Sequence, residues 1–185
     1  STGGPAALAA LLPSLAPIAT SVPILIVQHV LAGFDDALAD WLAQVTQLPV
    51  RIATQGMPMR GGVIALAPEG KHLIAQSPHI VGVVETPAIA NHRPSGTPLF
   101  ESIARHFGDG ALAVMLTGMG NDGVDGLRAV KAAGGSVLVQ SPDTCVVSGM
   151  PGAAIAKGYA DSVLPIEELA MEIVDRVRAP ARAKH

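Results

Sequence analysis

The stretch Leu116-Thr117-Gly118-Met119-Gly120-Asn121-Asp122-Gly123 lies between an apolar run at residues 111–116 and a segment of helical apolar spacing at residues 124–133. The run predicts a buried strand, so the stretch is a strand-to-helix turn. Its glycines let the backbone take positive φ and let another group approach closely. Asp122 is suited to cap the following helix. It is equally suited to point a carboxylate into a crevice, because ligands of open α/β sheets bind at the carboxyl ends of strands.

Outward from this turn, strands alternate with helices. Apolar runs predict strands at residues 22–27, 50–53, 63–67, 72–76, 79–84, 111–116, 136–140 and 160–164. Helical spacing predicts helices at residues 6–15, 35–47, 97–107, 124–133, 152–157 and 165–177. Ser95 or Thr97 is suited to cap the helix at residues 97–107. The alternation is typical of a doubly wound α/β fold with a mostly parallel, Rossmann-like sheet. Tight connections between the three runs at residues 63–84 predict hairpins instead of crossovers, and hence an antiparallel β-hairpin insertion.

The composition excludes several classes of protein. Of 185 residues, 49% are hydrophobic and 15% are charged, which is typical of a globular protein. The net charge of −3 comes without a basic block, so we expect no nucleic-acid partner. The apolar runs are shorter than the roughly 20 residues of a membrane span, so we expect no membrane insertion. One cysteine, Cys145, excludes an internal disulfide framework and suits a reducing compartment, so we expect a cytoplasmic location.

Three side chains of the types found in serine hydrolases follow predicted strands or open predicted helices. Ser1 lies at a helix start, where N–H groups and the helix dipole favour an oxyanion; His29 follows the most hydrophobic strand; and Asp122 lies in the glycine-rich turn. If the strands are parallel, all three project toward one edge of the sheet. A serine hydrolase needs a nucleophile, a base and a group that orients the base. Spacing alone leaves the alternatives open: a capping Ser1, a structural His29 and a capping Asp122.

Eight segments, in order along nearly the whole chain, resemble the catalytic domain of the chemotaxis-receptor protein-glutamate methylesterases, the CheB family. They are STGGP at 1–5, PILIVQH at 23–29, GF at 33–34, APEGKHL at 67–73, HRPS at 92–95, LTGMGNDG at 116–123, CVVSGMPGAAI at 145–155 and VLP at 163–165. The two longest motifs, LTGMGNDG and CVVSGMPGAAI, are the most specific. The resemblance implies a catalytic domain over residues 1–178, followed by a mobile tail at residues 179–185.

The resemblance implies an enzyme that hydrolyses glutamate γ-methyl esters on the cytoplasmic helical bundles of chemoreceptors and releases methanol. Family members also deamidate receptor glutamines. Ser1 matches the family's nucleophile, His29 its general base and Asp122 the aspartate that orients the base. Thr2 and Met119 match residues that flank the site, and the backbone N–H of Met119 is a candidate oxyanion donor. The resemblance implies no metal and no cofactor, and the sequence has no CxxC, HExxH or clustered His pair.

The chain departs from the family pattern at its start. The family places the catalytic serine after a hydrophobic strand, and no such strand precedes Ser1, so we expect that the sequence has been trimmed there. Thr97 stands where the family commonly has Asp, at an expected cost of about 1 kcal/mol or less because Thr can also cap. Many members carry an N-terminal phosphoacceptor receiver domain that occludes the site. The expected partners are therefore chemoreceptors and a phosphorylated receiver domain in cis, or a separate response regulator.

The sequence also singles out residues of weaker meaning. Arg93 is a candidate contact for a receptor carboxylate, since its planar guanidinium suits that geometry, and its alternative is a surface ion pair. Met150 is a candidate lining residue of the substrate cleft, with core packing as the alternative. His72, His92 and His106 show no partner in the sequence and are interpreted as structural or solvated.

Three other functions remain as alternatives to a triad esterase. Ser1 is also suited to an N-terminal nucleophile whose own amine is the base, although this leaves His29 and Asp122 without roles. The chain is alternatively an inactive domain of the same fold that binds receptors or a signalling partner. A phosphate-binding α/β domain is disfavoured, because the sequence has neither a P-loop nor a GxGxxG with a suitable acidic residue.

Overall fold

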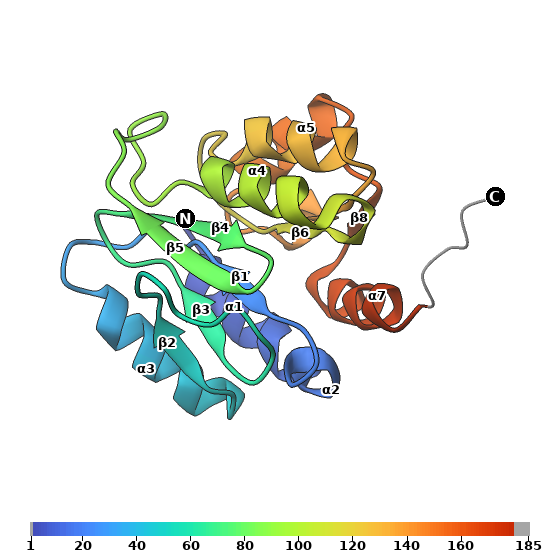
Figure 1. The fold of residues 1–185 in the computed structure, drawn as a ribbon. Helices are drawn as coiled ribbons and strands as arrows, with labels where there is room; N and C mark the ends of the chain where they lie inside the picture. The colour runs from blue at the N-terminus through green and yellow to red at the C-terminus, as the bar shows by residue number, and fades with distance from the viewer. Residues whose placement is uncertain (1, 180–185) are drawn as a thin grey trace.

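Within residues 2–179, the strands form two parallel three-stranded sheets and one antiparallel hairpin (Figure 1). The computed structural model describes residues 2–179, so Ser1 and residues 180–185 of the predicted tail lie outside the described residues. The strand order of the first sheet is β1 (Ile24–Ile26), β3 (Ile64–Leu66), β2 (Val50–Ile52). That of the second is β6 (Leu112–Met115), β7 (Ser136–Gln140), β8 (Ser162–Leu164). The hairpin pairs β4 (His72–Ser77) with β5 (Ile80–Val84). The predicted α/β fold with an antiparallel hairpin is thereby confirmed.

Helices cover both faces of these sheets (Figure 1). One face carries α1 (Gly4–Leu11), η1 (Leu12–Leu15), α2 (Ala16–Ala19), α3 (Asp35–Thr46) and α7 (Ile166–Arg178). The other carries α4 (Gly96–Phe107), α5 (Val124–Ala132) and α6 (Gly149–Ala156). Short turns η2 (Gly108–Gly110) and η3 (Pro142–Thr144) follow α4 and β7. No helix within residues 2–179 combines the length and the apolar character that a membrane crossing requires.

The predicted helix at residues 6–15 is wrong in its extent. The α-helical part, α1, ends at Leu11, and a 3₁₀ turn and a second short helix continue to Ala19. Pro13 lacks the N–H that would continue the α-helical hydrogen bonds of α1. Pro13 and Pro17 each lie in the first turn of a new helical segment, η1 and α2, where a missing N–H is tolerated. The result is a segmented stretch that wraps one face of the first sheet.

The strand at residues 63–67 is also not part of a hairpin, contrary to the prediction from its short connections. It is the centre of the first sheet, where Ile64 lies opposite Ile24 of β1 and Val50 of β2 in parallel register. All three residues of β3 are buried. A strand without polar alternation is typical of the middle of a parallel sheet covered on both faces. The prediction of a hairpin from the short connections around this strand is therefore wrong.

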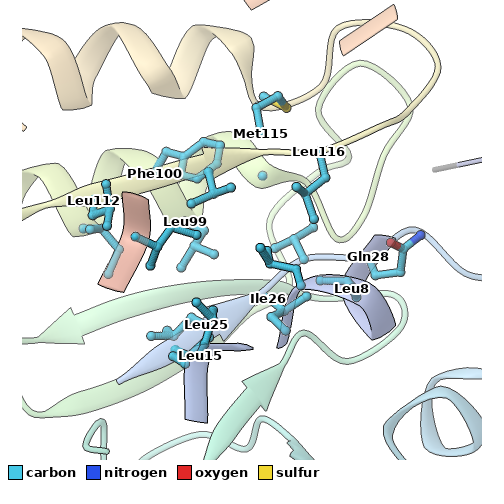
Figure 2. A pocket seen from close by; sticks show the side chains of 18 of the residues that line it. Leu8, Leu15, Leu25, Ile26, Gln28, Leu99, Phe100, Leu112, Met115 and Leu116 are labelled. Atoms are coloured by element: carbon cyan, nitrogen blue, oxygen red, sulfur yellow. The ribbon is translucent and has the colours of Figure 1, made fainter. Parts of the chain in front are cut away.

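The outer edges of the two parallel sheets, at β1 and β6, border an apolar cavity of about 390 Å³. Within the described chain, β1 is hydrogen-bonded only to β3, and β6 only to β7, so each presents an outer edge. Figure 2 shows side chains of both strands in the wall of the cavity, together with residues of α4 and of the first helical segment. Labelled there are Leu8, Leu15, Leu25, Ile26, Gln28, Leu99, Phe100, Leu112, Met115 and Leu116. The cavity is partly open to solvent and marks a gap in the packing, since protein interiors contain few voids larger than a water molecule.

Candidate active site

Three donors surround the carboxylate of Asp122. Its Oδ2 atom lies 2.8 Å from Nε2 of His29 and accepts the backbone N–H of Gly96 at 2.9 Å. Its Oδ1 atom accepts the hydroxyl of Ser95 at 2.5 Å. The Asp122 side chain is only 2% exposed. A buried carboxylate is tolerated when hydrogen bonds replace its hydration, and here both oxygens are bonded.

The capping interpretation of Asp122 is wrong. Helix α5 begins at Val124, and its N-cap is Gly123, which makes no side-chain capping bond. Gly123 has φ of 81°, which suits a residue without a Cβ atom, and a Cβ there would lie 3.1 Å from the Phe100 ring. The chain therefore changes direction at Gly123, and the carboxylate of Asp122 points to the start of α4.

His29 reaches Asp122 from the other parallel sheet. It follows β1, whereas Asp122 follows β6, and the two carboxyl ends lie at the same edge of the fold. The imidazole is 15% exposed, so it borders both the buried carboxylate and solvent. Because Nε2 bonds to Asp122, Nδ1 is the nitrogen placed to exchange a proton with a reacting group. An imidazole oriented by a carboxylate in this way is the arrangement of a general base.

The electrostatics keep Asp122 ionised. Burial opposes the charged carboxylate, but hydrogen bonds from His29, Ser95 and Gly96 outweigh it and hold the pKa below its usual value. The carboxylate thus remains an acceptor, which fixes the N–H tautomer of His29 at Nε2 and stabilises the ring when it gains a second proton.

This lowered pKa predicts an acid-sensitive stability contribution. Unfolded Asp has a pKa near ~3.9, so below about pH 4 the unfolded chain binds the extra proton and the free energy of unfolding falls with pH. We expect Asp122→Asn to cost about 2 kcal/mol at neutral pH, because an amide nitrogen would face a donor. The difference in the free energy of unfolding between the wild type and Asp122→Asn should then shrink as the pH falls toward about 2. Urea unfolding of both proteins from neutral pH down to about pH 2 measures this difference. The exposed Asp143→Asn is the matched control, and equal narrowing there would contradict the assignment to Asp122.

The start of the chain lies at the same edge of the fold. The Thr117 hydroxyl, after β6, hydrogen-bonds with the backbone oxygen of Thr2 at 3.1 Å. Gly4 packs so tightly on Gln28 that a Cβ atom there would lie 2.1 Å from its amide oxygen. The predicted flanking residue Thr2 is therefore beside both strand ends. Ser1, the predicted nucleophile, lies outside the described residues.

The remaining predicted residues are spread over the surrounding loops and the first turn of α6. Met119 lies in the glycine-rich turn with its side chain 66% exposed. Met150 packs against that turn, since a Cβ atom on Gly118 would lie 2.4 Å from its sulfur, and it also borders the cavity. Arg93 is exposed and its guanidinium donates to the backbone oxygen of Thr86 at 3.4 Å, so the structure does not bring it to the His29–Asp122 pair.

Sequence reasoning missed two residues of the site. Ser95 was considered only as a helix cap, and it does cap α4 through the Thr97 N–H, but its hydroxyl also donates to Asp122. His92 was considered structural or solvated, yet its ring stacks on that of His29. The only signal for either was their place in the HRPS motif at residues 92–95. Within residues 2–179, no group of three or more His, Cys, Asp or Glu side chains is placed to hold a metal ion.

Comparisons with known proteins agree on one family. The family model described as CheB methylesterase matches residues 1–173. A protein of Anaeromyxobacter dehalogenans named protein-glutamate methylesterase/protein-glutamine glutaminase 3 is 46% identical over 171 residues, which are 92% of this chain and 50% of that protein. A protein-glutamate methylesterase/protein-glutamine glutaminase of Moorella thermoacetica is 45% identical over 178 residues, 94% of this chain and 42% of that protein. The chain thus spans about half the length of such relatives.

A solved structure shows the same fold. The crystal structure of the Thermotoga maritima CheB methylesterase catalytic domain superposes with a TM-score of 0.89 at 36% sequence identity. The match covers 94% of this chain and 93% of that one. The likeness therefore extends over nearly the whole of this chain.

Proposed function

The chain belongs to the CheB methylesterase family, and from that premise we propose that it hydrolyses glutamate γ-methyl esters on chemoreceptors in the cytoplasm. The products are methanol and a glutamate side chain. Relatives at up to 46% identity are named for this activity and for glutaminase activity, so we extend the proposal to deamidation of receptor glutamines. The observation that carries it is the 2.8 Å contact between His29 Nε2 and the buried Asp122 carboxylate.

In the proposed mechanism, the Ser1 hydroxyl attacks the ester carbonyl while Nδ1 of His29 takes its proton. Backbone N–H groups, among them that of Met119, hold the tetrahedral oxyanion. The protonated His29 then gives its proton to the departing methoxide, which leaves as methanol. Water, deprotonated in turn by His29, resolves the acyl-enzyme to glutamate and restores Ser1. Asp122 stays ionised throughout and stabilises the cation on His29. The mechanism needs no metal and no cofactor.

We further propose that a strand leading into Ser1 occupies the cavity between β1 and β6. The cavity is apolar and lies between the outer edges of β1 and β6. Its lining runs from residues of α1 and α7 to His29 and Asp122. Thr2, bonded to Ser1, lies beside Thr117 at the carboxyl end of β6. A parallel strand ending there would join both sheets into one and deliver Ser1 to the site. Residues 1–178 then act as the catalytic domain of a longer chain.

The longer relatives support a regulated assembly. Because the chain spans about half of their length, we propose that a phosphoacceptor receiver domain, in cis or as a separate response regulator, controls access to the site.

The test is methanol release from methyl-labelled chemoreceptor membranes, using the domain extended ahead of Ser1 by the proposed strand. Release by the wild type and loss in Ser1→Ala would support the esterase. A folded wild type that releases none, yet still co-sediments with the receptors, would support the inactive binding domain instead. An N-terminal extension that abolishes activity would support the N-terminal-amine mechanism, because it blocks the amine and leaves His29 and Asp122 intact.

Exposed apolar side chains beside the site predict where the receptor binds. Leu31 and Phe34, in the loop after His29, are 77% and 59% exposed. We expect Leu31→Ser with Phe34→Ser to raise KM for methylated receptor about 10-fold, since each side chain loses about 0.7 kcal/mol of contact. The kcat value on a small glutamate methyl ester should not change.

The matched control for this prediction is Met171→Ser on α7, where the side chain is 62% exposed but lies away from the strand ends. A similar rise in KM in this control would contradict a binding surface at residues 31–34.

A further inference from the structure

His92 lies flat against the ring of the general base. The centroids of the His29 and His92 rings are 4.1 Å apart and the ring planes differ by 16°. We propose that His92 is a positioning residue that holds the His29 imidazole in the plane that faces Asp122. The inference rests on the proposed function, because it assigns His92 a part in the proton transfers of His29.

The stacked ring restrains the His29 imidazole from a direction that the Asp122 bond does not. The bond between His29 Nε2 and Asp122 Oδ2 holds one edge of the ring. The His92 ring packs on its face and opposes tilting out of that plane, which would move Nδ1 away from a reacting hydroxyl. Misplacement of a catalytic group by about 1 Å can cost 10²-fold in rate.

The backbone holds His92 in place through a tight turn. The N–H of His92 donates to the Ile89 oxygen at 2.8 Å, and the N–H of Ile89 donates to the His92 oxygen at 3.0 Å. Between them, Ala90 and Asn91 both have positive φ, at 48° and 67°. This conformation is costly for alanine, and such strain is retained where the surrounding structure fixes it, commonly at functional sites.

A buried histidine fastens both ends of the loop that carries His92. His72 is 0% exposed; its Nε2 donates to the Pro87 oxygen at 3.0 Å, and its Nδ1 accepts the Ser95 N–H at 3.1 Å. Ser95 is also the residue whose hydroxyl bonds to Asp122. One anchored loop therefore contacts both members of the pair, His29 through His92 and Asp122 through Ser95.

The environment keeps His92 neutral beside a ring that must become charged. Burial lowers the pKa of His92, the neighbouring His29 lowers it further, and Asp122 opposes them in part. Arg93, next in the chain, directs its guanidinium to the Thr86 oxygen. When His29 takes the serine proton, it therefore meets the face of an uncharged aromatic ring, which attracts a cation, and not a second imidazolium, which would repel it.

The experiment compares His92→Phe, which keeps a flat ring, with His92→Ala, which removes it. On a small glutamate methyl ester, we expect His92→Ala to lower kcat about 10- to 100-fold with KM unchanged. His92→Phe should stay within about 3-fold of the wild type. The half-buried His106→Ala on α4 is the matched control. An unchanged kcat in His92→Ala, or an equal loss in His92→Phe, would overturn the inference.

A second readout needs no substrate. In NMR spectra of the folded domain, the stacked ring should shift the ring protons of His29 upfield, and we expect this shift to persist in His92→Phe and to vanish in His92→Ala. If the wild type hydrolyses no ester but shows the shift, the proposed function fails and the stacking stands. If the wild type is active but the His29 protons are the same in His92→Ala, the positioning role is refuted while the function survives.

Discussion

Replacing His29 by Ala is expected to lower kcat for methyl-ester hydrolysis by about 10⁴- to 10⁶-fold, the largest effect of any single change at residues 2–179. Without the imidazole, no group bonded to the buried Asp122 carboxylate can take the serine proton. KM should change little, because the substrate is held by surrounding loops and backbone groups. Initial rates on a glutamate methyl ester, with a stopped assay for methanol, measure both constants.

The pair should behave as one unit. Asp122→Asn alone is expected to cost about 10⁴-fold, because it removes the group that fixes the His29 tautomer. Adding it to His29→Ala should cost nothing further, since the remaining catalysis no longer uses the imidazole. His79→Ala, on the exposed turn between β4 and β5, is the matched control and should be fully active. Multiplied losses in the double variant would show that the two residues act separately.

Adding an apolar strand of about six residues ahead of Ser1 is expected to raise the melting temperature by up to about 10 °C. A cavity of about 390 Å³ corresponds to at most about 9 kcal/mol at the measured dependence of stability on cavity volume. Ordering about six residues, at about 1 kcal/mol each, offsets about 6 kcal/mol of that gain. A net gain of at most about 3 kcal/mol is a shift of up to about 10 °C for a domain of this size. Calorimetry of the chain with and without this extension measures the shift.

The control extension carries Ser in place of each apolar residue and should give little stabilisation. Hydrogen exchange offers a local check, because the new strand should protect amides along the outer edges of β1 and β6 and leave the β4–β5 hairpin unchanged. Equal melting temperatures for the apolar and the Ser extension would mean that no strand enters the cavity.

Local signals predicted much of this fold. The apolar run at residues 111–116 and the glycines after it correctly gave β6, the turn and α5. Of the two candidate caps of α4, Ser95 and Thr97, the structure shows Ser95 at the cap. The error at β3 arose because short connections suggested a hairpin, whereas the pairing of a buried strand is decided by partners distant in the sequence. Periodicity reports whether a strand is buried, but it does not report which strands lie on either side of it.

The site was harder to predict for the same reason. His29 and Asp122 were singled out because both follow strands, and the structure brings them together across 93 positions of the sequence. The stacking of His92 could not be predicted, since it depends on a turn with two left-handed residues and on the buried His72. Neither contact leaves a periodic pattern. Ser95 was assigned its cap, which is local, but not its bond to Asp122, which is 27 positions away.

The position of the His29–Asp122 pair has a consequence for how the chain folds. Each residue follows an edge strand of a different parallel sheet, so the pair lies where two separately hydrogen-bonded sheets meet, over a hydrophobic cluster to which both sheets contribute. Either sheet can form its own hydrogen bonds first, but neither carries both His29 and Asp122. During refolding, the proposed esterase activity should therefore appear only when the two sheets come together, and an intermediate with one sheet formed should be inactive.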